Sequence, residues 1–468
     1  MKRTATIILL ALVGVALMAS LGTTRPRTNK PMGAYLTSAR IAVVDGRPTE
    51  ALMMLDSVSV YWGLVPEALH WSIEVYVDSL ESTSGVEAKK VVINKMLAYI
   101  DSLHMACDPD NEEVDEDLKE DCDEYIEQAD STRVKYFRQF YAAGRSNLQR
   151  IDRLMEDLEK AQDSSRIAFI KQDMSQFLDS IIINMRMSIM IDSSEFSPYV
   201  VIGDAYEKQE NYEEAVKWMK RGYDKAQDKS HLLLPLAYNY IQMDDYCSAI
   251  PYYREHVNGN PEDVDNMFNL AICYSNCGMT NDNPEYLDSA MATYRQIVEL
   301  QPGNVNALAN AGRYFLVEAQ EMSDSANYYR REMEDTLAAR KFEDRRRHMF
   351  DSSRAYFKQA FELVPDNEML AEQYAFTSAL LQDCEAAVQG FEVVAEARPD
   401  DAGVWTSLGD CYLKMGQYEK AIEAYEQVAR LKPEKVGVWE NLQALYKETK
   451  QPQKATEAAQ KVQELSGQ

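Results

Sequence analysis

The ionisable and nucleophilic side chains of this 468-residue chain do not fall into the spacings that known catalytic motifs require. The sequence has no G-x-S-x-G turn, no phosphate-binding P-loop, no dinucleotide-binding glycine pattern and no HExxH zinc motif. Its five histidines are scattered along the chain: His70, His104, His231, His256 and His348. His104 and Cys107 lie one helical turn apart, but two ligands do not make a zinc site. We therefore expect no catalytic site, no metal site and no cofactor, and predict that the protein is not an enzyme.

The densest group of carboxylates runs from Asp108 to Asp123 and reads DPDNEEVDEDLKEDCD. Clustered carboxylates can hold calcium. The EF-hand loop, however, needs glycine at its sixth position, and Glu113 occupies that position here. We interpret the run as a solvated acidic loop.

The seven cysteines are an odd number, so at least one thiol is unpaired within the monomer. Cys107 and Cys122 bracket the acidic run and could form a disulfide in an oxidising compartment. Cys273 and Cys277 lie one helical turn apart. Without a second cysteine pair or a nearby histidine, we interpret them as core side chains rather than as metal ligands.

The formal net charge of −27 argues against binding to nucleic acid or to an anionic membrane surface through bulk electrostatics. It is typical of acidic helices kept soluble by their charge, and it also suits a basic partner. The main basic cluster lies in residues 323–350, where acidic residues interleave at helical spacing. We interpret this stretch as a helical insertion that is either a docking element or a lengthened hairpin. Its basic residues are Arg330, Arg331, Arg340, Lys341, Arg345, Arg346 and Arg347.

Residues 1–30 contain an uncharged stretch from Thr4 to Thr24, which is long enough to span a bilayer. Lys2 and Arg3 precede this stretch. We expect an uncleaved N-terminal anchor, with the rest of the chain in an extracytoplasmic space such as the periplasm. The alternative is a cleaved signal peptide and a secreted protein. Basic residues flank both sides of the stretch, so charge does not settle its orientation.

The pattern of secondary-structure elements is clearest from Ala402 to Lys435, where two helical patterns flank a break at Gly416. Gly409 and Ala421 are small, which predicts that two helices cross closely there. Pro433 cannot donate the hydrogen bond that would continue the second helix. The same pattern recurs 34 residues later, where Trp439 follows Trp405. Prolines recur at the same interval: Pro365, Pro399 and Pro433.

This stretch resembles one tetratricopeptide repeat, with W-x2-L-G-x2-Y in its first helix and alanine, an aromatic residue and proline in its second. The resemblance is clear over residues 196–465 and degenerate before that. It implies an all-α fold, a right-handed superhelical solenoid of stacked antiparallel helix pairs, here preceded by the N-terminal apolar helix. We expect a helical region over 34–195, which contains the acidic loop of residues 108–123, and a repeat array over 196–468. In the third repeat we expect a longer connection from Gly278 to Pro284.

Tetratricopeptide arrays take a partner segment in a concave groove lined by their first helices. Carried onto this chain, the resemblance implies a partner-binding groove formed by Leu234, Tyr238, Ile241, Phe268, Ile272, Arg313, Leu316 and Phe376. Further inner-face positions are Val200, Asp204, Ala309, Glu372, Thr406 and Asp410.

We expect a non-catalytic, membrane-anchored scaffold that binds an apolar or basic segment of another protein. The alternative for the groove side chains is that Leu234, Phe268 and Phe376 pack against adjacent helices. The alternative for the whole protein is a receptor or enzyme whose site lies in the N-terminal helical half.

Overall fold

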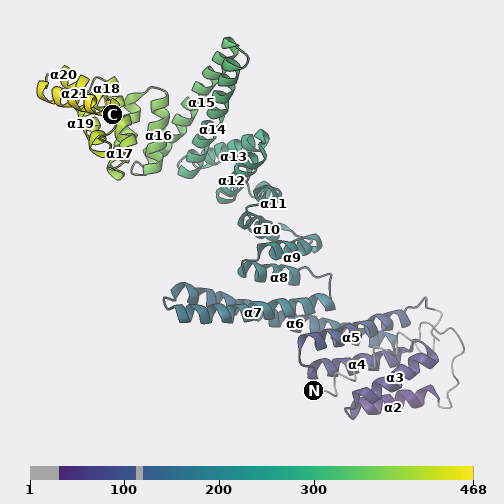
Figure 1. Cartoon of the computed structure of the whole chain (residues 1–468). Coiled ribbons are helices and arrows are strands. Elements are labelled where there is room, and N and C mark those ends of the chain that lie inside the picture. The colour runs from purple at the N-terminus through teal and green to yellow at the C-terminus, as the bar shows by residue number, and fades with distance from the viewer. Residues whose placement is uncertain (1–30, 112–119, 467–468) are drawn as a thin grey trace. The chain divides into compact units, whose positions relative to one another are not determined.

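The computed structural model describes residues 31–111 and 120–466, and within these ranges it contains twenty helices and no strand (Figure 1). The all-α prediction is confirmed. The apolar helix predicted within residues 1–30 lies outside the described residues. The chain divides into two compact units, the first ending at Leu232 and the second beginning at Leu233. The predicted domain limit at residue 196 and the handedness of the solenoid stay predictions.

The first unit consists of helices that follow one another in antiparallel pairs, and the second helix of one pair packs against the first helix of the next. Short connections before Pro48 and at Ser84-Gly85 separate the helices of the first two pairs. In chain order the helices are α2 (Met32–Val44), α3 (Pro48–Trp62), α4 (Pro66–Ser82), α5 (Val86–Ala106), α6 (Cys122–Lys160), α7 (Ser164–Ile191), α8 (Ser197–Lys208) and α9 (Tyr212–Lys225).

The long pair α6/α7 is built on isoleucine and methionine. The stretch SIIINMRMSIMI of α7 turns its apolar side chains inward, and Ile181, Met185 and Met187 are buried. Opposite them, α6 contributes Tyr136 and Ile151, which are also buried. The methionine-rich stripe is therefore a buried face.

The acidic loop is closed at its base by a disulfide between Cys107 and Cys122, whose Cα atoms lie 5.5 Å apart. This bond joins the end of α5 to the start of α6 and confirms the pairing that the sequence allowed. Residues 112–119 of the loop lie outside the described residues.

The second unit continues the alternation. We call the first helix of each pair helix A and the second helix B, and each helix B also packs against the next helix A. In chain order the helices are α10 (Ser230–Gln242), which begins just before the unit boundary, α11 (Tyr246–Gly259), α12 (Val264–Asn281), α13 (Pro284–Leu300), α14 (Val305–Arg331), α15 (Thr336–Leu363), α16 (Glu368–Leu380), α17 (Cys384–Ala397), α18 (Ala402–Lys414), α19 (Tyr418–Leu431), α20 (Val436–Glu448) and α21 (Pro452–Ser466).

Short polar side chains start many of these helices. Asp401 is typical, because its carboxylate accepts from the backbone N–H groups of Gly403 and Val404 at the start of α18. From α8/α9 onward, the turn between the two helices of each pair places one residue in the left-handed region, with φ between 50° and 71°. In chain order these residues are Glu210, Asp244, Asp282, Glu334, Gln382, Gly416 and Lys450.

Small residues allow the two helices of a pair to approach, as predicted for Gly409 and Ala421. A Cβ atom on Gly409 would lie 2.8 Å from the ring of Tyr425, and Ala421 is fully buried. At Gly390 the restriction is stronger, because a Cβ atom there would lie 2.3 Å from the backbone oxygen of Ala371. This close crossing fixes the geometry of the regular pairs.

The expected long connection from Gly278 to Pro284 is wrong. Helix α12 continues to Asn281 and α13 begins at Pro284, so the extra residues lengthen both helices instead of forming a loop. Gly278 lies inside α12, and a Cβ atom on it would meet Leu287 of α13 at 2.8 Å. The glycine therefore allows helix packing rather than a turn.

The basic insertion over residues 323–350 extends α14 and α15 into a long hairpin (Figure 1). Arg330 of α14 forms an ion pair with Glu343 of α15. The rings of Tyr329 and Phe342 stack with their centroids 5.2 Å apart. The structure therefore contains the lengthened hairpin that was one of the two interpretations of this stretch.

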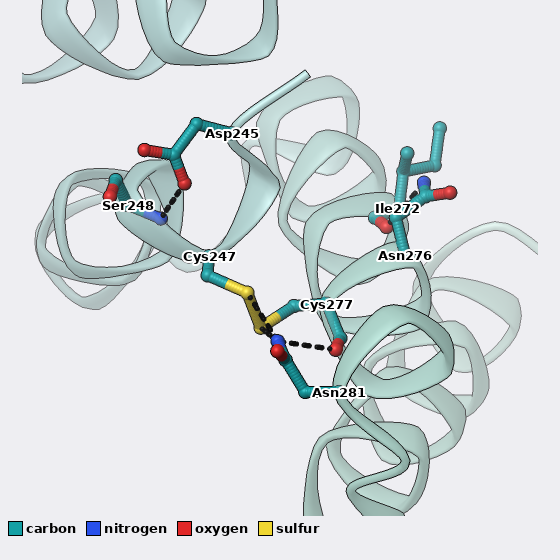
Figure 2. The surroundings of a disulfide bond; sticks show 7 residues. All are labelled: Asp245, Cys247, Ser248, Ile272, Asn276, Cys277 and Asn281. Atoms are coloured by element: carbon teal, nitrogen blue, oxygen red, sulfur yellow. Dashed lines mark hydrogen bonds between the residues drawn. A yellow bond between two sulfur atoms is a disulfide. The ribbon is translucent and has the colours of Figure 1, made fainter. Parts of the chain in front are cut away.

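A second disulfide joins Cys247 of α11 to Cys277 of α12, and Figure 2 shows it with its surroundings. The side-chain amide of Asn281 donates to the sulfur of Cys247 and to the carbonyl oxygen of Cys277, both at 3.0 Å. The interpretation of Cys277 as simple core packing is thus wrong, whereas Cys273 is a buried free thiol.

Candidate functional site

The eight groove residues predicted from the sequence all lie on helix A elements of the second unit. Leu234, Tyr238 and Ile241 are on α10, Phe268 and Ile272 on α12, Arg313 and Leu316 on α14, and Phe376 on α16.

Three of these eight side chains are exposed. Tyr238 has an exposed fraction of 44% and Phe376 one of 50%, and Arg313 is also exposed. Large exposed hydrophobic side chains on one surface are typical of binding sites. These three residues can meet a partner without any rearrangement of the helices.

The other five are half-buried, and all of them except Ile272 pack against a hydrophobic core cluster. Phe268 places its ring 5.9 Å from the ring of Tyr294 on α13, and Leu316 packs against the core of the following pairs. Leu234 and Ile241 pack around the buried Ala237 of their own helix and its neighbours. Leu234 and Phe268 therefore pack against adjacent helices, which was the alternative to a role in the groove. Phe376 is instead half exposed.

The structure brings α14 and α16 together through Arg313. Its guanidinium Nη2 donates to the sulfur of Met369 at 3.2 Å, which links two successive helix A elements. Met369 is 56% exposed and Leu380 is 44% exposed. With Phe376 they form a stripe along α16, because residues spaced by seven and four lie on one helix face. We call Arg313, Met369, Phe376 and Leu380 the α14/α16 face.

Met369 and Leu380 were missed by the sequence reasoning, which considered one or two inner positions in each helix A. The signal that could have found them is the spacing itself, since Met369, Phe376 and Leu380 recur at one helical face. What the sequence does not show is that nothing in the neighbouring described helices covers this face.

Three of the further inner-face positions are acidic and differ in their surroundings. Glu372 forms an ion pair with Arg398 at 2.8 Å, and Asp410 accepts a hydrogen bond from the hydroxyl of Tyr425. Asp204 on α8 is different, because burial raises its pKa to about 6, with a smaller contribution from Glu207. Ala309 packs against the core, and Val200 and Thr406 are half-buried.

The alternative function, a receptor or enzyme, would place its site in the helical pairs of the first unit. A cavity of about 200 Å³ lies between α2, α3 and α4, and its described lining contains a single ionisable side chain, Asp78. Among the described residues, no three His, Cys, Asp or Glu side chains are arranged to hold a metal ion. No helix within the described ranges is both long and apolar enough to cross a membrane.

Comparison with known proteins identifies two segments. Residues 196–224 and residues 402–435 each match a family model of the tetratricopeptide repeat. The first segment corresponds to α8/α9 and the second to α18/α19, so each unit contains one matched pair. No curated protein matches the chain.

Among solved structures, YrrB, described as a TPR protein with an unusual peptide-binding site, is 20% identical over 46% of this chain and 94% of its own, with a TM-score of 0.29. A MamA protein is 17% identical over 42% of this chain and 92% of its own, with a TM-score of 0.30. MamA from Desulfovibrio magneticus RS-1 is 19% identical over 42% of this chain and 94% of its own, with a TM-score of 0.28.

Proposed function

We propose that this chain, in which two segments match the tetratricopeptide repeat, is a non-catalytic scaffold that holds an apolar segment of another protein on the α14/α16 face. Tetratricopeptide repeats imply a protein–protein interaction scaffold. The position of the bound segment and its chemistry are the parts that we add.

The observation that carries this proposal is the exposure of the α14/α16 face. Met369, Phe376 and Leu380 are each about half exposed on one side of a short helix whose opposite side is fully packed. Burying side chains of this size contributes about 25 cal/mol per Å² of apolar area removed from water. A partner segment with an apolar stripe would gain this contribution.

The partner segment should be apolar at its centre. Arg313 stands at one end of the face, where its guanidinium can donate to a carboxylate or to a backbone carbonyl oxygen of the partner. Glu372, which could attract a basic residue, is already engaged by Arg398. The local chemistry therefore favours an apolar segment over a basic one on this face.

We also propose that residues 1–30 anchor the chain in a membrane and that the repeats lie in an extracytoplasmic space. The two disulfides support an oxidising compartment, since such bonds are rare where glutathione and thioredoxin keep thiols reduced. The mass of the chain isolated from its native membrane fraction tests this proposal. A chain that is soluble, or that lacks the leading segment, contradicts the anchor.

A pair of variants tests the binding face. Phe376→Ser with Leu380→Ser removes the apolar stripe without touching a buried position, and Phe169→Ser on α7 is a matched control, because Phe169 is 64% exposed. Partners are captured by crosslinking in cells that express the full chain, and the captured proteins are compared by quantitative mass spectrometry. We expect the double variant to lose a specific set of partners that the control retains.

Equal capture by the wild type and the double variant, with an unchanged circular dichroism spectrum, would contradict the proposed face. Loss of the same partners in the Phe169→Ser control would indicate that the binding surface lies on the first unit instead.

A further inference from the structure

A crevice of about 550 Å³ lies on the second unit between the helix B elements α17 and α19 and one side of α18. It is lined by Glu392, Ala395, Glu396, Pro399, Trp405, Leu408, Tyr412, Lys420, Glu423 and Ala424. The α18 residues of this lining are Trp405, Leu408 and Tyr412. The predicted groove positions of α18, Thr406 and Asp410, lie about 100° or more away around the helix. The crevice is therefore a different surface from the helix A face.

The aromatic walls of the crevice are held in place. The indole N–H of Trp405 donates to the carbonyl oxygen of Pro399 at 2.9 Å, and the hydroxyl of Tyr412 donates to Glu392. Leu408 and Tyr412 are buried beneath the opening. The rings therefore form a preformed surface, and a ligand would not have to order them.

The charges around these rings are unbalanced. The exposed carboxylates of Glu392, Glu396 and Glu423 surround the crevice, and the one cation in the lining is Lys420, whose ammonium lies 5.1 Å from the centroid of the Tyr412 ring. Within residues 31–111 and 120–466, none of these three glutamates is in an ion pair. The crevice thus has an excess of negative charge next to aromatic rings.

The same ten positions recur 34 residues later, and nine of them have the same residue type. The later set repeats the walls, because the indole N–H of Trp439 donates to the carbonyl oxygen of Pro433 at 2.9 Å and the hydroxyl of Tyr446 donates to Glu426 at 2.7 Å. The one difference is that Arg430 stands where the crevice has Glu396. We call this later set the register-related site.

Charge is balanced at the register-related site. Lys454 forms an ion pair with Glu426 at 2.9 Å, and its ammonium lies 5.2 Å from the centroid of the Tyr446 ring. Arg430 adds a second cation near Glu426, and Glu457 is the counterpart of Glu423. Nine shared residues therefore account for the packing of both sites, and the tenth position sets the net charge, which is negative at the crevice and balanced at the register-related site.

From this contrast we propose that the crevice between α17, α18 and α19 binds an arginine side chain of a basic protein segment. A guanidinium can stack on an aromatic ring and donate two parallel hydrogen bonds to a carboxylate, which a lysine ammonium cannot do with its compact charge. Trp405 supplies the ring, and Glu396 and Glu423 supply carboxylates that no other side chain within the described ranges engages in an ion pair. The surface goes beyond the proposed function, since it lies apart from the α14/α16 face.

The test follows the two indole N–H signals of Trp405 and Trp439 by nitrogen-15 NMR, with the signals assigned from Trp→Phe variants. The probe is the capped peptide acetyl-Ala-Leu-Arg-Leu-Ala-amide, and its control is the same peptide with citrulline, the neutral isostere, in place of arginine. We expect the arginine peptide to shift the Trp405 signal and to leave the Trp439 signal in place. The citrulline peptide should bind about tenfold more weakly, as expected for losing a charge-assisted pair.

Two charge variants sharpen the test. Glu396→Arg copies the register-related site and should weaken binding at Trp405 by about tenfold or more, while Arg430→Glu should make the Trp439 signal respond to the peptide. Both changes are on exposed side chains, so the fold should persist, and circular dichroism checks this. Equal shifts at both indoles in the wild type, or equal binding of the citrulline peptide, would overturn the proposal.

The double variant of the α14/α16 face separates this inference from the proposed function. Phe376→Ser with Leu380→Ser should still bind the arginine peptide with unchanged affinity. Loss of peptide binding in that variant would place the peptide on the α14/α16 face and would overturn the assignment to the crevice.

Discussion

The pairs α8/α9 and α18/α19 match the same repeat family, yet they meet its structural requirements with different residues. Gly203 and Gly409 occupy the same crossing position. A Cβ atom on Gly203 would meet the side chain of Met219, and a Cβ atom on Gly409 would meet the ring of Tyr425. The hydroxyl of Tyr425 also donates to Asp410, whereas methionine offers no such donor to Asp204.

The turns of the two pairs differ as well. Glu210 and Gly416 occupy the same left-handed position, and only the second is glycine. Asn211 caps α9 by accepting from the backbone N–H of Glu214, while Gln417 forms no side-chain cap. Pair α18/α19 has the glycine that favours the left-handed turn, and pair α8/α9 has the side-chain cap. Both pairs form the same repeat, so we infer that its geometry depends on the helix crossing rather than on a particular cap or turn residue.

The largest effect should come from Asp204→Asn in α8/α9. The pKa of Asp204 is raised to about 6 by burial, above the value of 3.8 expected in the unfolded chain. The folded state therefore favours the neutral form, and the ionised carboxylate reduces stability increasingly as the pH rises from about 4 to about 6. At pH 7.5 the neutral amide should raise the free energy of unfolding by on the order of 2 to 3 kcal/mol.

Urea unfolding at several pH values, followed by circular dichroism, measures this gain, which should shrink as the pH falls from 6 to 4. Asp204→Glu keeps the charge and serves as the control. A gain that does not depend on pH would show that burial of the charge is not its cause.

The next effect separates the two crossings. Gly409→Ala should lower the free energy of unfolding by about 1–2 kcal/mol, because overpacking against the Tyr425 ring outweighs the helix propensity gained. Gly203→Ala should cost more, since a Cβ atom there would lie 2.4 Å from Cγ of Met219 and 3.2 Å from the backbone oxygen of Ala215. Thermal unfolding of both variants decides the order. Equal losses would mean that the identity of the facing side chain is unimportant.

The turn position should give an effect of about 1 kcal/mol in opposite directions. Glu210→Gly removes a side chain from a left-handed backbone with a φ of 59° and should stabilise α8/α9, while Gly416→Glu should destabilise α18/α19. Midpoints of urea unfolding for the two variants provide the measurement. If Gly416→Glu is neutral, the turn is free to change its conformation.

The smallest effect concerns the caps. Asn211→Ala should cost about 0.5–1 kcal/mol, and Gln417→Asn should gain a similar or smaller amount by introducing the cap that α19 lacks. The comparison uses the same unfolding assay with Gln417→Ala as a reference. A stabilising Asn211→Ala change would contradict the role of the cap.

Much of the second unit could be predicted from the sequence, because its helix crossings require small residues, and these recur at a fixed interval along the chain. Gly409 and Ala421 lie at the close helix crossing that their small size predicted, and the helical stretch predicted over residues 323–350 is present as a lengthened hairpin. The prediction of a turn at Gly278 was wrong, because the sequence does not distinguish a glycine that allows close helix packing, here against Leu287, from a glycine that forms a turn.

The remainder depends on contacts between helices that are distant in the sequence. The Cys247–Cys277 bond requires the register of α11 on α12, which no local pattern gives. Phe268 and Phe376 are both aromatic residues at inner-face positions, yet only Phe268 meets a ring, that of Tyr294, on the next helix. Exposure at the candidate site is thus set by neighbouring pairs rather than by the repeat itself.

The most direct measurement of the proposed scaffold function is site-specific photo-crosslinking, with a benzophenone amino acid placed at Phe376 or at Phe169. Both side chains are exposed phenylalanines, one on the α14/α16 face and the other on α7. The proposed function predicts discrete crosslinked partners at position 376 and none of them at position 169. The same products at both positions, or none at 376 in cells that express the full chain, would contradict it.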